Sequence, residues 1–189
     1  MAEEKIINLS HEIKNFVYPN DPEFSVKTKK NGKYSVSELK MGVHTGTHID
    51  YPLHIGLTNE KFENVFGKGY CISIENLDNF FKNPPKNLEI LLINTGFSKY
   101  WGNEEYFEKE CDIGKYVEKI ISLNLNAVGI DCYSIGNFEV HEKILSSKIK
   151  IIENMKNLEI LENKSFKFFG FPLNIEKIDG SPINAVAFL

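Results

Sequence analysis

The middle of the chain alternates short apolar runs rich in β-branched residues with stretches of helical periodicity. The runs are bounded by Gly, Asn or Asp, which is typical of strands. A helical pattern separates each run from the next, so the order favours strand–helix–strand crossovers and a partly parallel sheet. In chain order the five segments are Ile90–Asn94, Ile113–Leu123, Ala127–Ile130, Glu139–Ser147 and Ile149–Ile152.

Strand-like runs also dominate the rest of the chain, where Glu104–Phe107 is the one further helical pattern. A chain of 189 residues without an internal repeat or low-complexity tract fits a single domain. We therefore predict one β-rich α/β domain over residues 1–189, with a mixed sheet. The remaining strand-like runs are Lys5–Leu9, Phe24–Thr28, Ser35–Met41, Tyr70–Ile74, Lys167–Phe169 and Val186–Leu189.

Charge and cysteine content exclude several classes of protein. The chain carries 22 Lys, no Arg and a formal net charge of -4, so a nucleic-acid partner is not expected. No apolar run reaches the length of about 18 residues that a membrane helix needs, so no membrane partner is expected either. The three cysteines, Cys71, Cys111 and Cys132, form neither a metal-type pair nor a disulfide framework. We expect a reduced, cytoplasmic protein.

Three of the five histidines fall within residues 44–54, together with an aspartate. The poor helix formers between His44 and His48 favour an extended chain over a helix that carries them at i, i+4. In an extended chain alternate side chains share a face, so two imidazoles and the Asp50 carboxylate converge, and His54 follows after a bend at Pro52. Imidazole and carboxylate together are a ligand set for Zn²⁺, Mn²⁺ or Fe²⁺. A metal site is therefore favoured over ordinary surface histidines.

Further ligands have to come from elsewhere in the chain. His141 lies in the helical pattern Glu139–Ser147, and Glu153 ends the apolar run Ile149–Ile152. Glu153 shares the parity of Ile149 and Ile151, and a carboxylate on a core-facing row is costly to bury unless it is paired or ligated. Taken alone, each residue also fits an exposed position.

The segment from His44 to His54 resembles the His-x-Gly-Thr-His-x-Asp-x-Pro-x-His signature of the metal-dependent cyclase family, which includes bacterial kynurenine formamidases and isatin hydrolases. Weaker similarities extend over nearly the whole chain. They are Leu9-Ser10-His11, Tyr18-Pro19, Gly129-Ile130-Asp131 with Ser134, His141 with Ile152-Glu153-Asn154, and Asp179-Gly180-Ser181-Pro182.

This resemblance implies a swivelling β/β/α-type fold and one or two zinc ions, or manganese, in each subunit. By resemblance, His44, His48 and Asp50 hold a first metal, with Asp50 also bridging. His141 resembles a ligand of a second metal, and Glu153 resembles a bridging carboxylate. The family usually forms homodimers, so a homodimer or higher homo-oligomer is expected.

By the same resemblance, His54 is the general acid/base, although contact with the second metal is an alternative. The implied activity is metal-dependent hydrolysis of a small amide, as in an arylformamidase, with N-formylkynurenine as the leading substrate. The sequence departs from the family at Tyr18, Asn20 and Asn184, which leaves the substrate open. A cyclic amide or lactone hydrolase of the same family, or a non-catalytic metal-binding protein that keeps the fold, are the alternatives.

Aromatic residues can supply the walls of a substrate pocket. Tyr18 is the first candidate, because it lies in the stiff, proline-containing loop of residues 16–24. Packing over a turn explains Tyr18 equally well. The other candidates are Phe62, Phe66, Tyr100 and Trp101.

Overall fold

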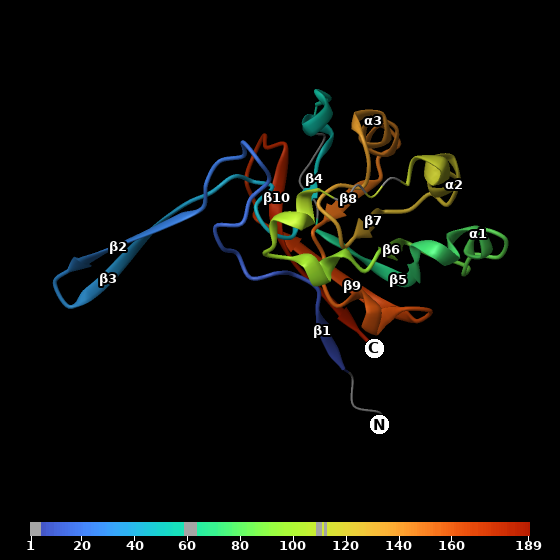
Figure 1. Cartoon of the computed structure of the whole chain (residues 1–189), viewed down its shortest axis with the longest axis horizontal. Helices are drawn as coiled ribbons and strands as arrows, with labels where there is room; N and C mark the ends of the chain where they lie inside the picture. The colour runs from blue at the N-terminus through green and yellow to red at the C-terminus, as the bar shows by residue number, and fades with distance from the viewer. Residues whose placement is uncertain (1–4, 59–63, 109–110, 112) are drawn as a thin grey trace.

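The computed structural model describes residues 5–58, 64–108, 111 and 113–189. Eight strands form one sheet in the order β1-β10-β4-β8-β7-β6-β5-β9 (Figure 1). Because β9 also pairs with β10, seven strands close into a barrel-like ring, and β1 pairs with the C-terminal end of β10. The strands are β1 (Ile6–Asn8), β4 (His48–Asp50), β5 (Val65–Ser73), β6 (Ile90–Asn94), β7 (Ala127–Ile130), β8 (Lys150–Glu153), β9 (Ser165–Pro172) and β10 (Gly180–Phe188).

The sheet is mixed, as the sequence predicts. Strands β5, β6, β7 and β8 pair in parallel, whereas β1, β4, β9 and β10 make antiparallel pairs. The parallel strands are joined by crossovers that carry the three α-helices, as the alternating pattern in the middle of the chain indicates. Figure 1 shows these helices in a row beside the parallel strands. They are α1 (Leu77–Phe80), α2 (Val117–Ser122) and α3 (Phe138–Ser146).

Alternation along β6 explains how one sheet buries two cores. Ile90 and Leu92 belong to a cluster built from strands all round the ring, whereas Leu91 and Ile93 belong to a cluster that includes the helices. All four side chains are fully buried. A strand buried on both faces is expected to read as a continuous apolar run, which is the pattern in this segment.

Gly129 on β7 has a packing role within the ring. A Cβ atom at this position would lie 2.6 Å from Leu92 Cδ2 and 2.6 Å from Met155 Sδ. The absence of a side chain therefore lets β7 pack closely against the two larger residues.

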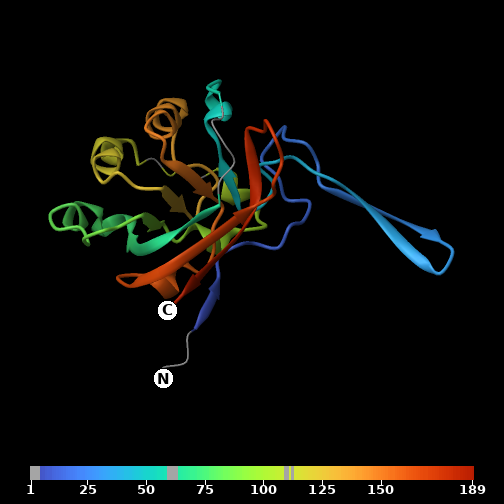
Figure 2. The same ribbon diagram turned by 180° about the vertical axis from the view of Figure 1, so that it is seen from behind.

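Two of the expected strands form a separate arm. Strands β2 (Ser25–Asn31) and β3 (Tyr34–Lys40) pair with each other as a two-stranded sheet of their own. Figures 1 and 2 show the arm projecting away from the rest of the molecule. Almost every residue in it is exposed, including four apolar side chains: Val26, Tyr34, Val36 and Leu39.

Short 3-10 helices connect several elements. The expected helix at Glu104–Phe107 is one of them, and the expected helix at Ile113–Leu123 divides into a 3-10 turn followed by α2. No helix among the described residues has the length and hydropathy that a membrane crossing needs. The 3-10 helices are η1 (Pro52–Ile55), η2 (Ile74–Asn76), η3 (Phe97–Tyr100), η4 (Glu104–Phe107), η5 (Gly114–Tyr116) and η6 (Leu158–Leu161).

Candidate metal centre

The pairing of β4 with β8 brings three predicted site residues together. His48 lies opposite Glu153, and Asp50 lies opposite Ile151. Ile49 is directed into the core within the ring, so the side chains on either side of it point the other way. His48, Asp50 and Glu153 therefore share the face that carries α3, and all three are buried.

The extended chain predicted for residues 44–54 is wrong outside β4. His44 lies in a turn, where Gly46 has the left-handed φ of +71°, and His54 lies in η1, which has a proline in its first turn. Glycine favours the turn and proline begins the helix, so the regular strand is confined to residues between Gly46 and Pro52. The imidazoles nevertheless converge. The ring centroids of His44 and His48 are 5.0 Å apart, and those of His44 and His54 are 4.6 Å apart.

Helix α3 brings His141 to the same face. The Asn137 side chain caps this helix by accepting a hydrogen bond from the backbone N–H of Val140 at 3.1 Å. The Asn137 carbonyl lies 3.0 Å from His141 Nδ1, so Nδ1 carries a proton whether the ring is neutral or charged. Nε2 then faces the cluster, 3.2 Å from Glu153 Oε1.

Hydrogen bonds from outside the cluster hold its members in place. His48 Nδ1 lies 3.0 Å from the Gly46 carbonyl, which also accepts a hydrogen bond from Asn154 Nδ2 at 3.0 Å. The backbone N–H of Ile135 donates to Glu153 Oε1 at 2.7 Å. Such partners fix the tautomer and orientation that a metal ligand needs. They leave His48 Nε2 facing the Asp50 and Glu153 carboxylates, at 3.5 and 3.4 Å.

Opposite charges shift the pKa values of the cluster. Burial disfavours the charged form of His48, but the hydrogen bond to Glu153 and the nearby Asp50 carboxylate prevail and raise its pKa to about 9. Burial acts in the same way on His141, and the Glu153 carboxylate raises the pKa of that imidazole to about 9. Burial opposes ionisation of Asp50 and Glu153, yet the histidines hold the pKa of each carboxyl below its usual range.

The donor set fits a divalent cation. Both Asp50 carboxylate oxygens and His44 Nε2 are buried without a well-aligned hydrogen bond among the described residues, and the contacts that they make are with other members of the cluster, as between His44 Nε2 and Asp50 Oδ1 at 3.3 Å. Buried polar atoms of this kind require a partner, and a cation supplies one for an acceptor-only carboxylate. Asp50 is common to two groups whose ligand atoms all lie within 4.8 Å of one another. These groups are His44, His48 and Asp50, and Asp50, His54 and His141.

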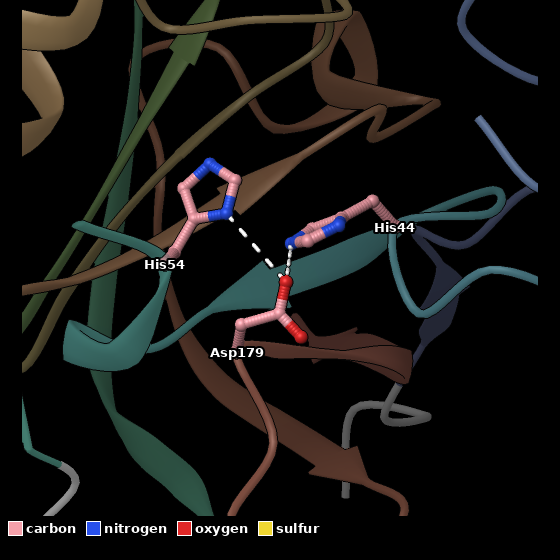
Figure 3. Close-up of side chains that lie close together, drawn as sticks. All are labelled: His44, His54 and Asp179. Carbon is pink, nitrogen blue, oxygen red and sulfur yellow. Dashed lines mark ion pairs between the residues drawn. The ribbon is translucent and has the colours of Figure 1, made fainter. Parts of the chain in front are cut away.

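Asp179 completes a third group, for which the sequence analysis assigned no role. Figure 3 shows its carboxylate between His44 and His54. Its Oδ2 lies 3.7 Å from His44 Nε2 and 3.9 Å from His54 Nδ1. The neighbouring Gly180 leaves space for this arrangement, because a Cβ there would lie 2.5 Å from His44 Nε2. The only sequence signal for these residues was their position in the Asp179-Gly180-Ser181-Pro182 segment.

The cluster forms one side of a cavity of about 490 Å³. Tyr18 and Trp101 line it, whereas Phe66 and Tyr100 are not among its described lining residues, and Phe62 lies outside the described part of the chain. Several lining residues were not predicted because only the fold brings them to the cavity, and Asp21, Phe107 and Tyr133 are among them.

Comparison with known proteins supports the family resemblance of the histidine motif. Residues 7–137, well over half of the chain, match the model of the Cyclase family, which is described as "Putative cyclase". The chain belongs to the Cyclase family. A cyclase-family membership also agrees with the mixed, strand-rich fold, and both expectations are confirmed.

Relatives of this cyclase-family protein match it over nearly their whole length. An uncharacterized protein of Methanocaldococcus jannaschii is 50% identical, over 98% of this chain and 100% of its own. A kynurenine formamidase of Bacillus cereus is 27% identical, over 98% of each chain.

Solved structures show the same fold at lower sequence identity. A predicted metal-dependent hydrolase from Bacillus stearothermophilus has a TM-score of 0.83 at 23% identity and 99% coverage of both chains. Isatin hydrolase A from Ralstonia solanacearum has a TM-score of 0.81 at 16% identity, covering 98% of this chain and 92% of its own.

Proposed function

We propose that this protein is a metal-dependent hydrolase of a small amide, with an arylformamide such as N-formylkynurenine as the leading substrate. One observation carries the proposal. Buried imidazoles and carboxylates from separate segments converge at an aromatic-lined cavity, and the ion-pair contacts of the Asp50 carboxylate among the described residues are with the histidines of the cluster. The formamidase relative at 27% identity supports the choice of substrate class.

The proposed metal is Zn²⁺, as one or two ions per subunit, with Mn²⁺ as the alternative. His44, His48 and Asp50 would hold a first ion, and His141 would hold a second with Asp50 and Glu153 shared between them. When bound, a divalent cation supplies Lewis-acid chemistry, which polarises a carbonyl and lowers the pKa of water. The mixture of imidazole and carboxylate ligands suits both metals.

His54 is the proposed general acid/base. Its side chain is 36% exposed, so it can exchange protons with a water in the cavity. It would accept a proton from the attacking water and return that proton to the amide nitrogen as the carbon–nitrogen bond breaks. The Asp179 carboxylate lies near this ring, with its Oδ2 3.9 Å from His54 Nδ1.

A substrate panel with metal analysis tests the proposal. The zinc-loaded protein is expected to hydrolyse N-formylkynurenine or formanilide, and isatin tests for a cyclic amide instead. Asp50→Asn and Glu153→Gln are expected to lose both metal and activity, and full retention of both would contradict the assignment. A protein that binds zinc and hydrolyses nothing in the panel would be a non-catalytic metal-binding protein.

His54→Gln separates the two roles open to that residue. A general acid/base contributes about 10²–10⁴-fold to the rate, so activity should fall by this factor while the metal content is unchanged. Loss of metal together with activity would instead make His54 a ligand, as its proximity to Asp50 and His141 allows.

We also propose that the protein is a homodimer in which the β2–β3 arm contacts a second copy. Val26 pairs across the arm with Leu39, and Tyr34 and Val36 alternate along β3, so apolar side chains lie on both faces of an exposed ribbon. A lone two-stranded ribbon is marginally stable, and a partner surface would stabilise it. Sedimentation tests this by giving the oligomeric state of the wild type and of the double variant Tyr34→Ser/Val36→Ser. A monomeric wild type would contradict the proposal.

A cytoplasmic location is proposed as well. Cys71, Cys111 and Cys132 are all buried and unpaired. Free thiols persist in reducing compartments, whereas oxidising ones favour disulfides. Fractionation of cells that express the protein is expected to recover it with the cytoplasmic proteins.

A further inference from the structure

The cavity wall beside the cluster is built from aromatic rings that brace one another. Tyr18 stacks on Tyr133, with ring centroids 5.5 Å apart and 28° between the planes, and meets the edge of Phe107 at 5.6 Å. Phe16 stacks on Phe107 at 4.7 Å. Trp101 contacts the edge of Phe16 at 4.9 Å. All five rings line the cavity, so a ligand would meet aromatic groups, which attract cations as well as other rings.

Among the described residues of this wall, the one fixed charge is negative. Asp21 lines the cavity, and its backbone N–H donates to the Tyr18 carbonyl at 3.0 Å, which holds it in the same turn. No lysine is among the described lining residues, and the chain has no arginine. The ammonium of Lys14 lies 5.9 Å from the Phe16 ring, but that side chain is exposed and does not line the cavity.

The Asp21 carboxylate has no ion-pair partner within 4.0 Å among the described residues. It is partly buried, so solvent compensates its charge only in part. A ligand that brings a positive charge to this place would gain a charge-assisted hydrogen bond and contact with the rings. A ligand that brings a carboxylate to this place would meet a like charge, and the described lining residues offer it no guanidinium or ammonium.

We infer that the substrate of this site is an amide that carries a protonated amine, with Asp21 as the counter-charge and the aromatic wall around it. The inference rests on the proposed amide hydrolysis for its reaction and adds the charge of the substrate. Asp21 is then a binding residue that determines specificity and takes no part in breaking the bond.

Three matched formanilides test the inference with the zinc-loaded protein. They carry at the meta position a methyl, an aminomethyl or a carboxylate group, and hydrolysis of each releases formate and the parent aniline. We expect kcat/KM to be about tenfold higher for the aminomethyl compound than for the methyl compound, which corresponds to about 1.4 kcal/mol for one charged hydrogen bond. The carboxylate compound should be the poorest substrate.

Two variants assign the preference to its residue. Asp21→Asn keeps the shape of the side chain and removes its charge, so it should abolish the advantage of the aminomethyl compound over the methyl compound. Glu23→Gln, two residues away, is the matched control because Glu23 is exposed and outside the cavity lining. It should leave the order of the three substrates unchanged. An equal preference in Asp21→Asn and wild type would overturn the role of Asp21.

A binding measurement separates this inference from the proposed function. Trp101 is the single tryptophan of the chain and lines the cavity, so its fluorescence reports ligands that enter. The corresponding acetanilides should bind in the order aminomethyl, methyl, carboxylate, and Asp21→Asn should remove the first difference. If that order holds while no formanilide is cleaved, the hydrolase proposal fails and the charge preference stands. If formanilides are cleaved without regard to charge, or the carboxylate compounds bind best, the charge preference is refuted.

Discussion

Loading the metal centre should release protons, because two of its proposed ligands are protonated when no metal is bound. The pKa values of His48 and His141 are both raised to about 9 by the neighbouring carboxylates. At pH 7 both imidazoles are therefore almost fully charged, whereas a cation binds the neutral ring. The pKa values of Asp50 and Glu153 are lowered, so these carboxylates are already ionised and contribute no protons. Zinc binding at pH 7 should release about two protons in total.

The pKa values set the size of the effect. One pKa unit corresponds to about 1.36 kcal/mol, so removing a proton from two rings titrating about two units above pH 7 costs about 5 kcal/mol. A lower pH favours the protonated, metal-free form of the protein and therefore weakens zinc binding. Between pH 6 and 8 the apparent affinity for zinc should rise about 100-fold per pH unit, tenfold for each proton displaced.

Calorimetric titration with zinc in two buffers of different ionisation enthalpy counts the protons released, and competition with a chelator gives the affinity at each pH. Glu153→Gln removes the carboxylate that raises both histidine pKa values, so it should release fewer protons as well as bind more weakly. Glu159→Gln, on the exposed side of η6, is the control and should match the wild type. An affinity that is constant from pH 6 to 8, or binding without proton release, would refute the reasoning.

Three further predictions concern stability. Gly46→Ala should lower the free energy of unfolding by about 1–2 kcal/mol, because Gly46 has a φ of +71°. It should also weaken zinc binding, because the Gly46 carbonyl orients His48. Gly32→Ala, at a φ of +61° in the arm, should lower the free energy of unfolding without affecting zinc binding. A chelator should lower the Tm of protein held in zinc at 100 times its Kd by about 5–10 °C, and no shift would argue against a bound metal. Burial, with Lys156 nearby, lowers the pKa of His11 to about 4, so the free energy of unfolding should fall as the pH decreases from 6.5 to 4. The urea midpoint of His11→Gln should fall less than that of the wild type over this pH range. Equal losses in the two proteins would refute this.

The strand–helix alternation could be predicted from the sequence because the residue pattern within each segment indicates whether it is a strand or a helix. The apolar segment Ile90–Asn94 is buried on both faces, and its boundaries in the structure are those expected from the sequence. Closure of the ring depends instead on β9 pairing with both β5 and β10, which are far apart in the chain. The pattern at Lys167–Phe169 indicated a strand, but not its length or its two neighbours, since register between distant strands is decided by packing.

The sequence indicated which residues lie together at the candidate site, but not the backbone geometry that brings them there. The even spacing of His44, His48 and Asp50 suggested one face of one strand, yet only two of these residues lie in β4. His44 and His54 reach the cluster from a turn and a 3-10 helix, where strand alternation does not apply. Asp179 escaped notice because a single carboxylate beside a glycine has no distinctive pattern until β10 brings it against the histidines.

The lack of arginine affects the electrostatics of the cavity because Asp21 lies in the cavity wall. A cation bound by Asp50 and Glu153 would offset the two carboxylates at the cluster, whereas Asp21 pairs with no described group in the wall. The cavity is then positive or neutral where a carbonyl oxygen would be polarised and negative where the rest of the substrate lies. Such a separation of charge orients an amide before any bond is broken, which lowers the entropic part of the barrier. A guanidinium in the wall would neutralise this polarity, so a chain that lacks arginine is consistent with a substrate that supplies the cation itself.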